Sequence, residues 1–335
     1  CTSLERRMKK IWCNILKVDN VNINDNFFNV GGESLSAVTL ISAIREEFKL
    51  NLPLKILFKY PTISKLCNVL SNELDEIKRD NEKLIVLKEG SKSLPPLVLL
   101  HPMDGGLFCY QDLIKELNIS NKILGFEAFG YDSKEEKTLS NIKLMAEKYV
   151  QELKEKFPNG PYNLIGWSFG GTIAFEMNNI LEKMNGITNR VILIDAPVLE
   201  KNKNYEYKVD SQVSSTVEYA VDILGLDANH LTGNKEQDLN YIINESIRLN
   251  ILPKVYDFKM IQNHINLMLS HKKAILNYSF TNPIKSDINL FYATTNNTNT
   301  NFQVSEKDWS IRTEGQVFSS GVAGNHLSIV KNPYV

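Results

Sequence analysis

The stretch Tyr162-Asn-Leu-Ile-Gly-Trp-Ser-Phe-Gly-Gly171 begins as a short apolar run and breaks at Gly166. Its first four residues are too few for anything but a buried strand, and the residues that follow Gly171 have helical periodicity. Ser168 lies at the break in the pattern Gly-x-Ser-x-Gly, which is typical of a sharp strand-to-helix turn that exposes a nucleophilic hydroxyl beside free backbone N–H groups. A glycine-rich turn in which the serine only caps the helix is the alternative. The strand before the turn and the helix after it favour the nucleophile.

Length and composition indicate a globular chain of two domains. The chain has 335 residues, of which 43% are hydrophobic, and its net charge is −1. Such a balance argues against a nucleic-acid or membrane-surface partner. The sequence contains no long apolar run and no signal peptide, so we expect a soluble cytoplasmic protein. Four scattered cysteines without metal-ligand spacing predict reduced thiols and no metal site. The first residue, Cys1, suggests a piece of something longer.

Residues 1–76 have the pattern of a small helical unit. Two apolar stripes with helical spacing cover residues 4–16 and 35–48. Between them, Gly31-Gly-Glu-Ser34 places Ser34 at the start of the second helix. A phosphodiester on Ser34 would meet unpaired N–H groups and the positive end of the helix dipole. These residues alone also permit Ser34 to be a simple helix cap.

The run FFNVGGESLSAVTLISAIREEF, followed by LPLKILFKYPTISKLCNVL, resembles the peptidyl carrier domains of nonribosomal peptide synthetases. This resemblance implies an all-α four-helix bundle in which Ser34 carries 4'-phosphopantetheine. It also implies three partners, namely a phosphopantetheinyl transferase and the upstream condensation and adenylation domains. Glu33 stands where an aspartate or histidine is common, while the serine and glycines are intact. Polyketide and fatty-acid carriers share the serine, so the peptidyl assignment is less specific than the carrier assignment.

After a charged linker at residues 77–82, the pattern of residues 83–335 changes to short apolar runs with helical stretches between them. We expect strands at residues 84–87, 97–100, 123–126, 162–165, 191–194 and 288–293. Strands that alternate with helices predict a mostly parallel sheet covered on both faces. Active sites of such sheets lie at the carboxyl ends of strands, and Ser168 follows one of them.

A nucleophilic serine needs a base and an orienting acid. In α/β-hydrolases these residues follow one another in the order serine, acid, histidine. Asp195 ends an expected strand and directly precedes a turn at Ala196-Pro197. Of the five histidines, His326 follows a glycine-containing turn near the end of the chain, whereas His101 precedes the nucleophile and His271 stands beside two lysines. We predict a triad of Ser168, Asp195 and His326, with His101 as a structural anchor.

The expected strand at residues 97–100 ends in His101-Pro-Met-Asp-Gly-Gly106, a glycine-rich loop upstream of the nucleophile. We predict that the backbone N–H groups of Phe169 and Met103 form an oxyanion hole. A simple strand-ending turn is compatible with this interpretation, because an oxyanion loop is also a turn.

Four motifs in this order, LHPxxGG, GWSFGG, IDAP and GNHL, make residues 83–335 resemble the terminal thioesterase domains of peptide synthetases. The resemblance implies an α/β-hydrolase fold with a helical lid insertion at approximately residues 199–285. Asp104 stands where such loops carry a small residue, which should change the polarity near the site more than its chemistry. The chain ends soon after His326, where the family usually adds a helix, and this suggests a trimmed C-terminus.

Together the two resemblances imply a carrier–thioesterase pair from the end of a peptide synthetase. The peptidyl thioester on the pantetheine arm of Ser34 would pass to Ser168 and be released by hydrolysis or macrocyclisation, between which the sequence does not choose. An editing thioesterase that clears misloaded carriers is a second enzymatic interpretation. A non-catalytic carrier scaffold is disfavoured because no triad position is lost.

Overall fold

The computed structural model describes residues 2–50, 52–72, 82–131, 137–198, 221, 226–249, 258–280, 282–295 and 304–335. By chain packing it divides into two compact units. The first contains the chain up to Glu82 and a later segment that includes residues 226–249, and the second contains the sheet. The carrier, linker and thioesterase boundaries remain predictions, and the predicted lid lies partly outside the described residues.

The first unit begins with helices α1 (Ser3–Leu16), α2 (Ser34–Phe48), α3 (Ile56–Lys59) and α4 (Ile63–Asn72). Helix α1 starts with a capping box, because the Thr2 hydroxyl accepts from the Glu5 N–H while the Glu5 carboxylate accepts from the Thr2 N–H. Its apolar stripe is buried through Met8 and Trp12, and the Trp12 ring meets Phe27 edge-on at 5.2 Å. Helix α10 (Lys235–Arg248) also belongs to this unit.

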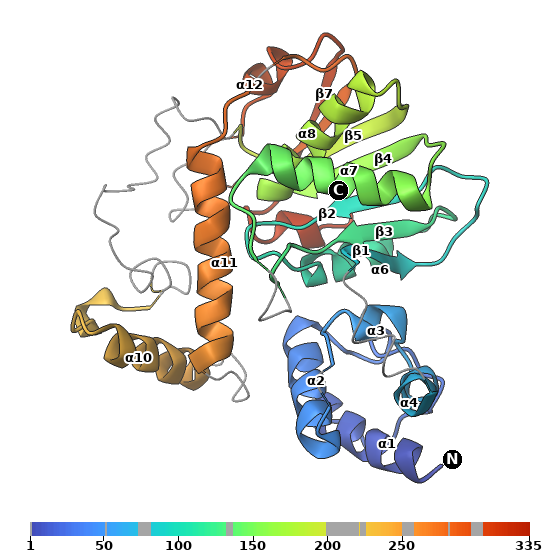
Figure 1. The fold of residues 1–335 in the computed structure, drawn as a ribbon, viewed down its shortest axis with the longest axis vertical. Helices are drawn as coiled ribbons and strands as arrows, with labels where there is room; N and C mark the ends of the chain where they lie inside the picture. The colour runs from blue at the N-terminus through green and yellow to red at the C-terminus, as the bar shows by residue number, and fades with distance from the viewer. Residues whose placement is uncertain are drawn as a thin grey trace. The chain divides into compact units, whose positions relative to one another are not determined.

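The second unit is built on one sheet, which holds seven strands within the described residues. The strands are β1 (Leu84–Lys88), β2 (Leu97–Leu100), β3 (Ile123–Phe126), β4 (Tyr162–Trp167), β5 (Thr188–Ile194), β6 (Ile288–Ala293) and β7 (Val317–Val322). They lie in the order β1-β3-β2-β4-β5-β6-β7, with β1 antiparallel to β3 and the other pairs parallel (Figure 1). The prediction of a mostly parallel sheet is confirmed, while β7 is a strand that the sequence analysis did not predict.

Helices α7 (Ile142–Lys156) and α8 (Phe169–Lys183) pack against one face of this sheet (Figure 1). Alternate residues of β2, β3 and β4 form an apolar core with the buried stripes of both helices. The other elements are η1 (Phe108–Tyr110), α6 (Gln111–Glu116), η2 (Ala228–His230), α11 (Phe258–Leu276), α12 (Glu306–Ser310) and η3 (Ile329–Lys331). Among the described residues, every helix is too short or too polar to span a bilayer.

The strand order reverses at the end of β2. Strand β2 lies between β3 and β4 in the sheet. After β2 the chain forms β3 on one side of it, and then passes through α7 to form β4 on the other side. Leu100, the last residue of β2, pairs with Gly166 of β4. Loops diverge where the strand order reverses, and open parallel sheets bind their ligands at such points. The glycine-rich loop after β2 and the turn after β4 therefore begin side by side.

Candidate active site

Ser168 forms the turn between β4 and α8 and has φ +55° and ψ −125°, values that non-glycine residues rarely adopt. The glycines on either side are required by close packing. A Cβ on Gly166 would lie 2.1 Å from the Gly170 carbonyl oxygen, and a Cβ on Gly170 would lie 2.3 Å from that of Leu100. The Ser168 N–H donates to the Ile194 carbonyl at 3.0 Å, which ties the turn to the end of β5. This is the sharp strand-to-helix turn that the Gly-x-Ser-x-Gly pattern predicts.

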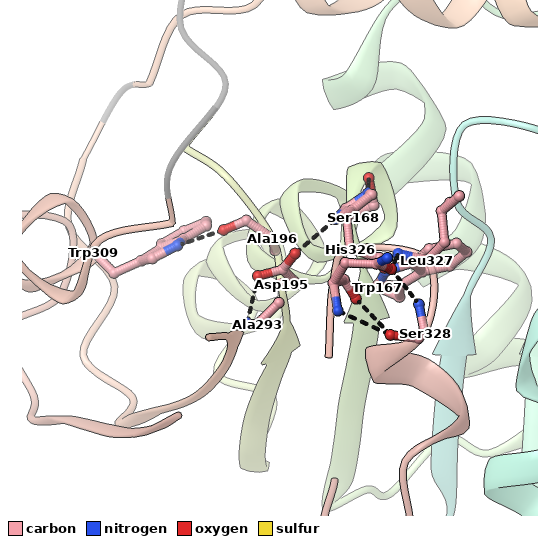
Figure 2. A network of polar contacts seen from close by, with 10 residues as sticks. Trp167, Ser168, Asp195, Ala196, Ala293, Trp309, His326, Leu327 and Ser328 are labelled. Atoms are coloured by element: carbon pink, nitrogen blue, oxygen red, sulfur yellow. Dashed lines mark hydrogen bonds and ion pairs between the residues drawn. The ribbon is translucent and has the colours of Figure 1, made fainter. Parts of the chain in front are cut away.

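The structure brings Ser168, His326 and Asp195 into one hydrogen-bonded chain (Figure 2). His326 Nδ1 lies 2.7 Å from Asp195 Oδ2, and His326 Nε2 lies 3.0 Å from Ser168 Oγ. The other carboxylate oxygen, Oδ1, accepts from the Ala293 N–H at 2.9 Å. A carboxylate only accepts, so Nδ1 carries a proton, and when the ring is neutral its bare Nε2 faces the serine hydroxyl. This is the tautomer that a general base requires.

The loop that carries His326 is held by its own turn and by β4. Asn325 Oδ1 accepts from the N–H groups of Leu327 and Ser328, at 3.1 and 3.0 Å, and Ser328 Oγ accepts from the Asn325 N–H at 2.9 Å. The Trp167 indole N–H donates to the His326 carbonyl at 3.1 Å, and its ring lies 5.3 Å from the imidazole (Figure 2). The residue before the predicted nucleophile is thus hydrogen-bonded to the backbone of the predicted base.

Asp195 is the first residue after β5 and has φ +41°. Its N–H donates to the Phe291 carbonyl of β6 at 2.7 Å. The next carbonyl, that of Ala196, accepts from the Trp309 indole N–H at 2.9 Å (Figure 2). The loop is therefore bound both to the neighbouring strand and to α12, and the carboxylate of Asp195 faces His326.

His101 opens the loop after β2 and is fully buried. Its Nδ1 lies 2.9 Å from the Pro102 carbonyl oxygen, and its Nε2 lies 2.9 Å from the Tyr149 hydroxyl. Burial, with the nearby His271 as a second cause, lowers the pKa of His101 to about 3. The ring is therefore neutral at physiological pH, and its contacts are those of an anchor for the loop.

Tyr110 of η1 ties the ends of β2 and β4 together. Its hydroxyl donates to the Leu100 carbonyl at 2.7 Å and accepts from the Trp167 N–H at 2.8 Å. Burial raises the pKa of Tyr110 well above its ordinary value, and the charges of Cys109 and Asp104 add to that rise. Asp104 itself closes the loop, because its Oδ1 accepts from the Gly106 N–H at 3.1 Å.

His271 of α11 is a site residue that sequence reasoning missed. Only 1% of its surface is exposed, and its Nδ1 lies 2.8 Å from the Met103 carbonyl oxygen. Its ring lies 5.0 Å from that of Phe169, at an interplanar angle of 25°. The sequence showed a histidine beside two lysines, and no local pattern indicates a contact between segments so far apart in the chain.

Ser34, in the other unit, is the first residue of α2, as predicted. The preceding turn is open, since Gly31 has φ +98° and a Cβ there would meet nothing within 4 Å. Ser36 Oγ accepts from the Glu33 N–H at 2.8 Å and donates to the Glu33 carbonyl at 2.9 Å, so this second serine closes the cap. A phosphate on Ser34 would lie at the electropositive end of a long helix, a position that fits phosphopantetheine.

Two family models match the chain. The model described as a thioesterase domain matches residues 95–334, and the model of the phosphopantetheine attachment site matches residues 6–70. Malpinin synthetase of Mortierella alpina is 33% identical over 211 residues, which cover 63% of this chain and 3% of the synthetase. Tyrocidine synthase 3 of Brevibacillus parabrevis is 27% identical over 262 residues, which cover 78% of this chain and 4% of that protein. The chain thus spans only a few per cent of these relatives.

A solved structure is also similar over nearly the whole chain. It is a four-domain nonribosomal peptide synthetase in its holo form, bound to AMP and glycine. The TM-score is 0.64 and the sequence identity 26%, and the match covers 98% of this chain and 25% of the other. The two matched domains therefore occur together in a chain of that kind.

Proposed function

We propose that this chain, which belongs to the thioesterase domain family and carries a phosphopantetheine attachment domain before it, releases a peptidyl chain by acyl transfer to Ser168. The observation that carries the proposal is the hydrogen-bonded chain from Ser168 through His326 to Asp195. The similarity to a nonribosomal peptide synthetase of known structure supports a peptide as the acyl group.

The first half of the proposed reaction makes an acyl-enzyme. Ser168 Oγ attacks the thioester carbonyl carbon while His326 Nε2 takes its proton, and Asp195 stabilises the resulting imidazolium. The N–H groups of Phe169 and Met103 donate to the oxyanion of the tetrahedral intermediate. Collapse of this intermediate breaks the carbon–sulfur bond, and the departing thiolate receives the proton from His326.

The second half releases the product. Water, or an amine or hydroxyl of the peptide itself, attacks the Ser168 ester, and His326 again takes the proton of the attacking group. Water gives an acid by hydrolysis, and an internal nucleophile gives a ring by macrocyclisation. The triad geometry serves both outcomes equally.

The carrier part of the proposal rests on Ser34. When bound there, 4'-phosphopantetheine supplies a flexible arm whose thiol holds the acyl chain as a thioester. The N-terminus of α2 would hold its phosphate. We also propose that α1, α2, α3 and α4 form the carrier bundle, and that a helical lid at approximately residues 199–285 covers Ser168 and excludes water.

The proposed partners follow from these two activities. They are a phosphopantetheinyl transferase, which would modify Ser34, and condensation and adenylation domains upstream, which would supply the peptide in the cytoplasm. A carrier in the same chain supports product release over the editing of misloaded carriers.

Turnover of a small soluble peptidyl thioester tests the proposed chemistry. Ser168→Ala and His326→Ala should each lower kcat by about 10³-fold or more, because triad members act as a unit. Intact-protein mass spectrometry should detect an acyl-enzyme in the unmutated chain and none in Ser168→Ala. Release by Ser168→Ala at the unmutated rate would overturn the proposal. The product mass distinguishes a ring from an acid, which differ by one water.

A further inference from the structure

Two histidines bind consecutive backbone carbonyls around Met103. His101 Nδ1 lies 2.9 Å from the Pro102 oxygen, and His271 Nδ1 lies 2.8 Å from the Met103 oxygen. A carbonyl oxygen only accepts, so in both contacts Nδ1 carries the proton and donates. His101 Nε2 then lies 2.9 Å from the Tyr149 hydroxyl oxygen.

These two bonds fix the direction of the Met103 N–H. The Pro102–Met103 peptide bond is trans and planar, so the Pro102 carbonyl and the Met103 N–H point in opposite directions. A donor that fixes the carbonyl therefore also aims the N–H. The bond from His271 fixes the following peptide group, between Met103 and Asp104. The peptide groups before and after Met103 are therefore both restrained.

Helix α11 meets the same loop at a second point, one turn earlier. Leu267 and His271 are four residues apart and so lie on one face of α11. A Cβ on Gly105 would lie 2.6 Å from Leu267 Cδ2. Gly105 also has φ +85°, a conformation that favours glycine. The helix thus contacts the loop through an apolar and a polar side chain, and both are buried.

The ring of His271 also contacts the residue that follows the nucleophile. It lies 5.0 Å from the Phe169 ring and 5.1 Å from the His101 ring, and those two rings lie 6.0 Å apart. The three rings therefore contact one another. They come from α11, from the first position of α8 and from the loop after β2. His271 consequently contacts both residues whose N–H groups are the proposed oxyanion donors.

We propose that His271 is a positioning residue of the oxyanion hole, which sets the Met103 and Phe169 amides through its hydrogen bond to the Met103 carbonyl and its ring contact with Phe169. This inference rests on the proposed thioesterase function. His271 takes no proton from Ser168, because the serine hydroxyl faces His326. Its contribution is to transition-state stabilisation, so its loss should lower kcat and leave KM unchanged.

The test compares three substitutions in the full chain, with a soluble peptidyl thioester as substrate. His271→Phe keeps the ring contact and removes the donor, and it should lower kcat by about 10-fold to 100-fold, less than the 10² to 10³ lost with a direct oxyanion donor. His271→Asn, whose amide nitrogen lies near the position of Nδ1, should recover part of that loss. His271→Gln, whose amide lies nearer the position of Nε2, should not.

A peptidyl trifluoromethyl ketone, which forms a tetrahedral oxyanion on Ser168, supplies the second readout. Its affinity should fall by the same factor as kcat in His271→Phe. Ile187→Phe is the control for the new phenyl ring, because Ile187 is 64% exposed and directly precedes β5, at the opposite edge of the sheet from Ser168, and it should change neither quantity.

The outcomes separate this inference from the function on which it rests. Turnover by Ser168→Ala would refute the thioesterase mechanism itself. An inactive Ser168→Ala together with unmutated kcat or unmutated inhibitor affinity in His271→Phe would refute only the positioning role. Should His271→Phe fail to fold, equal kcat values for His271→Asn and His271→Gln would refute it.

Discussion

At the scale of single residues, the site depends on a backbone conformation that its surroundings impose. The strained dihedral angles of Ser168 cost on the order of 1–3 kcal/mol. Both of its backbone groups are bound, since the N–H donates to the Ile194 carbonyl and the carbonyl accepts from the Gly171 N–H, each at 3.0 Å. The glycines let α8 come close enough for these bonds to form. The strain is thus offset by the packing that it permits.

Gly170→Ala tests that close approach. The added methyl group would lie 2.3 Å from the Leu100 carbonyl oxygen and 2.9 Å from that of His101, so α8 must move away from the end of β2. We expect the free energy of unfolding to fall by about 3 kcal/mol, the upper end of the range typical of overpacking. Turnover should be lost as the turn opens. Denaturant unfolding and thioester hydrolysis measure the two effects. Gly233→Ala is the control, because its methyl group meets nothing within 4 Å and only the strain at φ +80° remains. Equal losses in the two variants would contradict the crowding argument.

The buried His101 predicts how stability changes with pH. Its pKa is about 3 in the folded chain and about 6.5 in an unfolded one, so between these values the unfolded state binds the extra proton. The contribution of His101 to stability is fully present above pH 6.5 and is lost progressively as the pH falls towards 3. His101→Gln cannot titrate, so its free energy of unfolding should fall less than that of the unmutated chain between pH 7.5 and about 5.5. Identical falls in both proteins would show that His101 is not the group responsible.

At the scale of secondary-structure elements, the candidate site lies along the common carboxyl edge of five adjacent strands. The loop after β2 supplies Met103, the turn after β4 supplies Ser168, and the loop after β5 supplies Asp195. The Ala293 N–H at the end of β6 donates to the Asp195 carboxylate, and His326 follows β7. Because side chains alternate between faces along a strand, the site requires the observed registers, in which Trp167 pairs with Ile194.

Trp167→Phe tests the link between β4 and the loop after β7. The substitution keeps a ring beside His326 but removes the indole bond to its carbonyl, a bond worth roughly 1 kcal/mol. We expect kcat for a soluble thioester to fall by about 5-fold to 10-fold, because a hydrogen bond of that size restrains the base loop. Trp12→Phe is the matched control. Among the described residues, the buried Trp12 indole nitrogen has no hydrogen-bond partner, so this change should leave kcat unaltered. A kcat for Trp167→Phe equal to that of the unmutated chain would contradict the link.

At the scale of the whole molecule, the most accurate sequence predictions are of features that a local residue pattern determines, such as buried strands and tight turns. Strands β2, β3 and β6 have the predicted bounds, and the turn at Ser168 and the start of α2 at Ser34 lie where their motifs place them. Strand β7 was missed because Val317-Phe-Ser-Ser-Gly-Val322 is an edge strand with exposed polar positions and no continuous apolar run. His271 was missed because its contact with Met103 exists only after α11 has packed against a loop distant in sequence.

The proposed function assigns different tasks to the two serines, so their loss should have separable effects. Ser168→Ala should still accept pantetheine from CoA with a phosphopantetheinyl transferase and Mg²⁺, and a peptidyl chain loaded on the carrier should persist, because no nucleophile attacks its thioester. Ser34→Ala should not be modified, yet it should hydrolyse soluble thioesters at the unmutated rate, because Ser168, His326 and Asp195 are untouched. Intact-protein and peptide mass spectrometry measure loading, and thiol release measures turnover.

Ser36→Ala is the matched control for the carrier. Ser36 lies two residues from Ser34 and caps the same helix through the Glu33 backbone, so this variant should lose some stability and still be modified at Ser34. Modification of Ser34→Ala on another residue would move the attachment site. A folded Ser34→Ala without activity towards soluble thioesters would mean that Ser34 takes part in the cleavage itself. Only the combination of an unmodified, active Ser34→Ala and a modified, inactive Ser168→Ala is consistent with one serine that carries the chain and another that cleaves it.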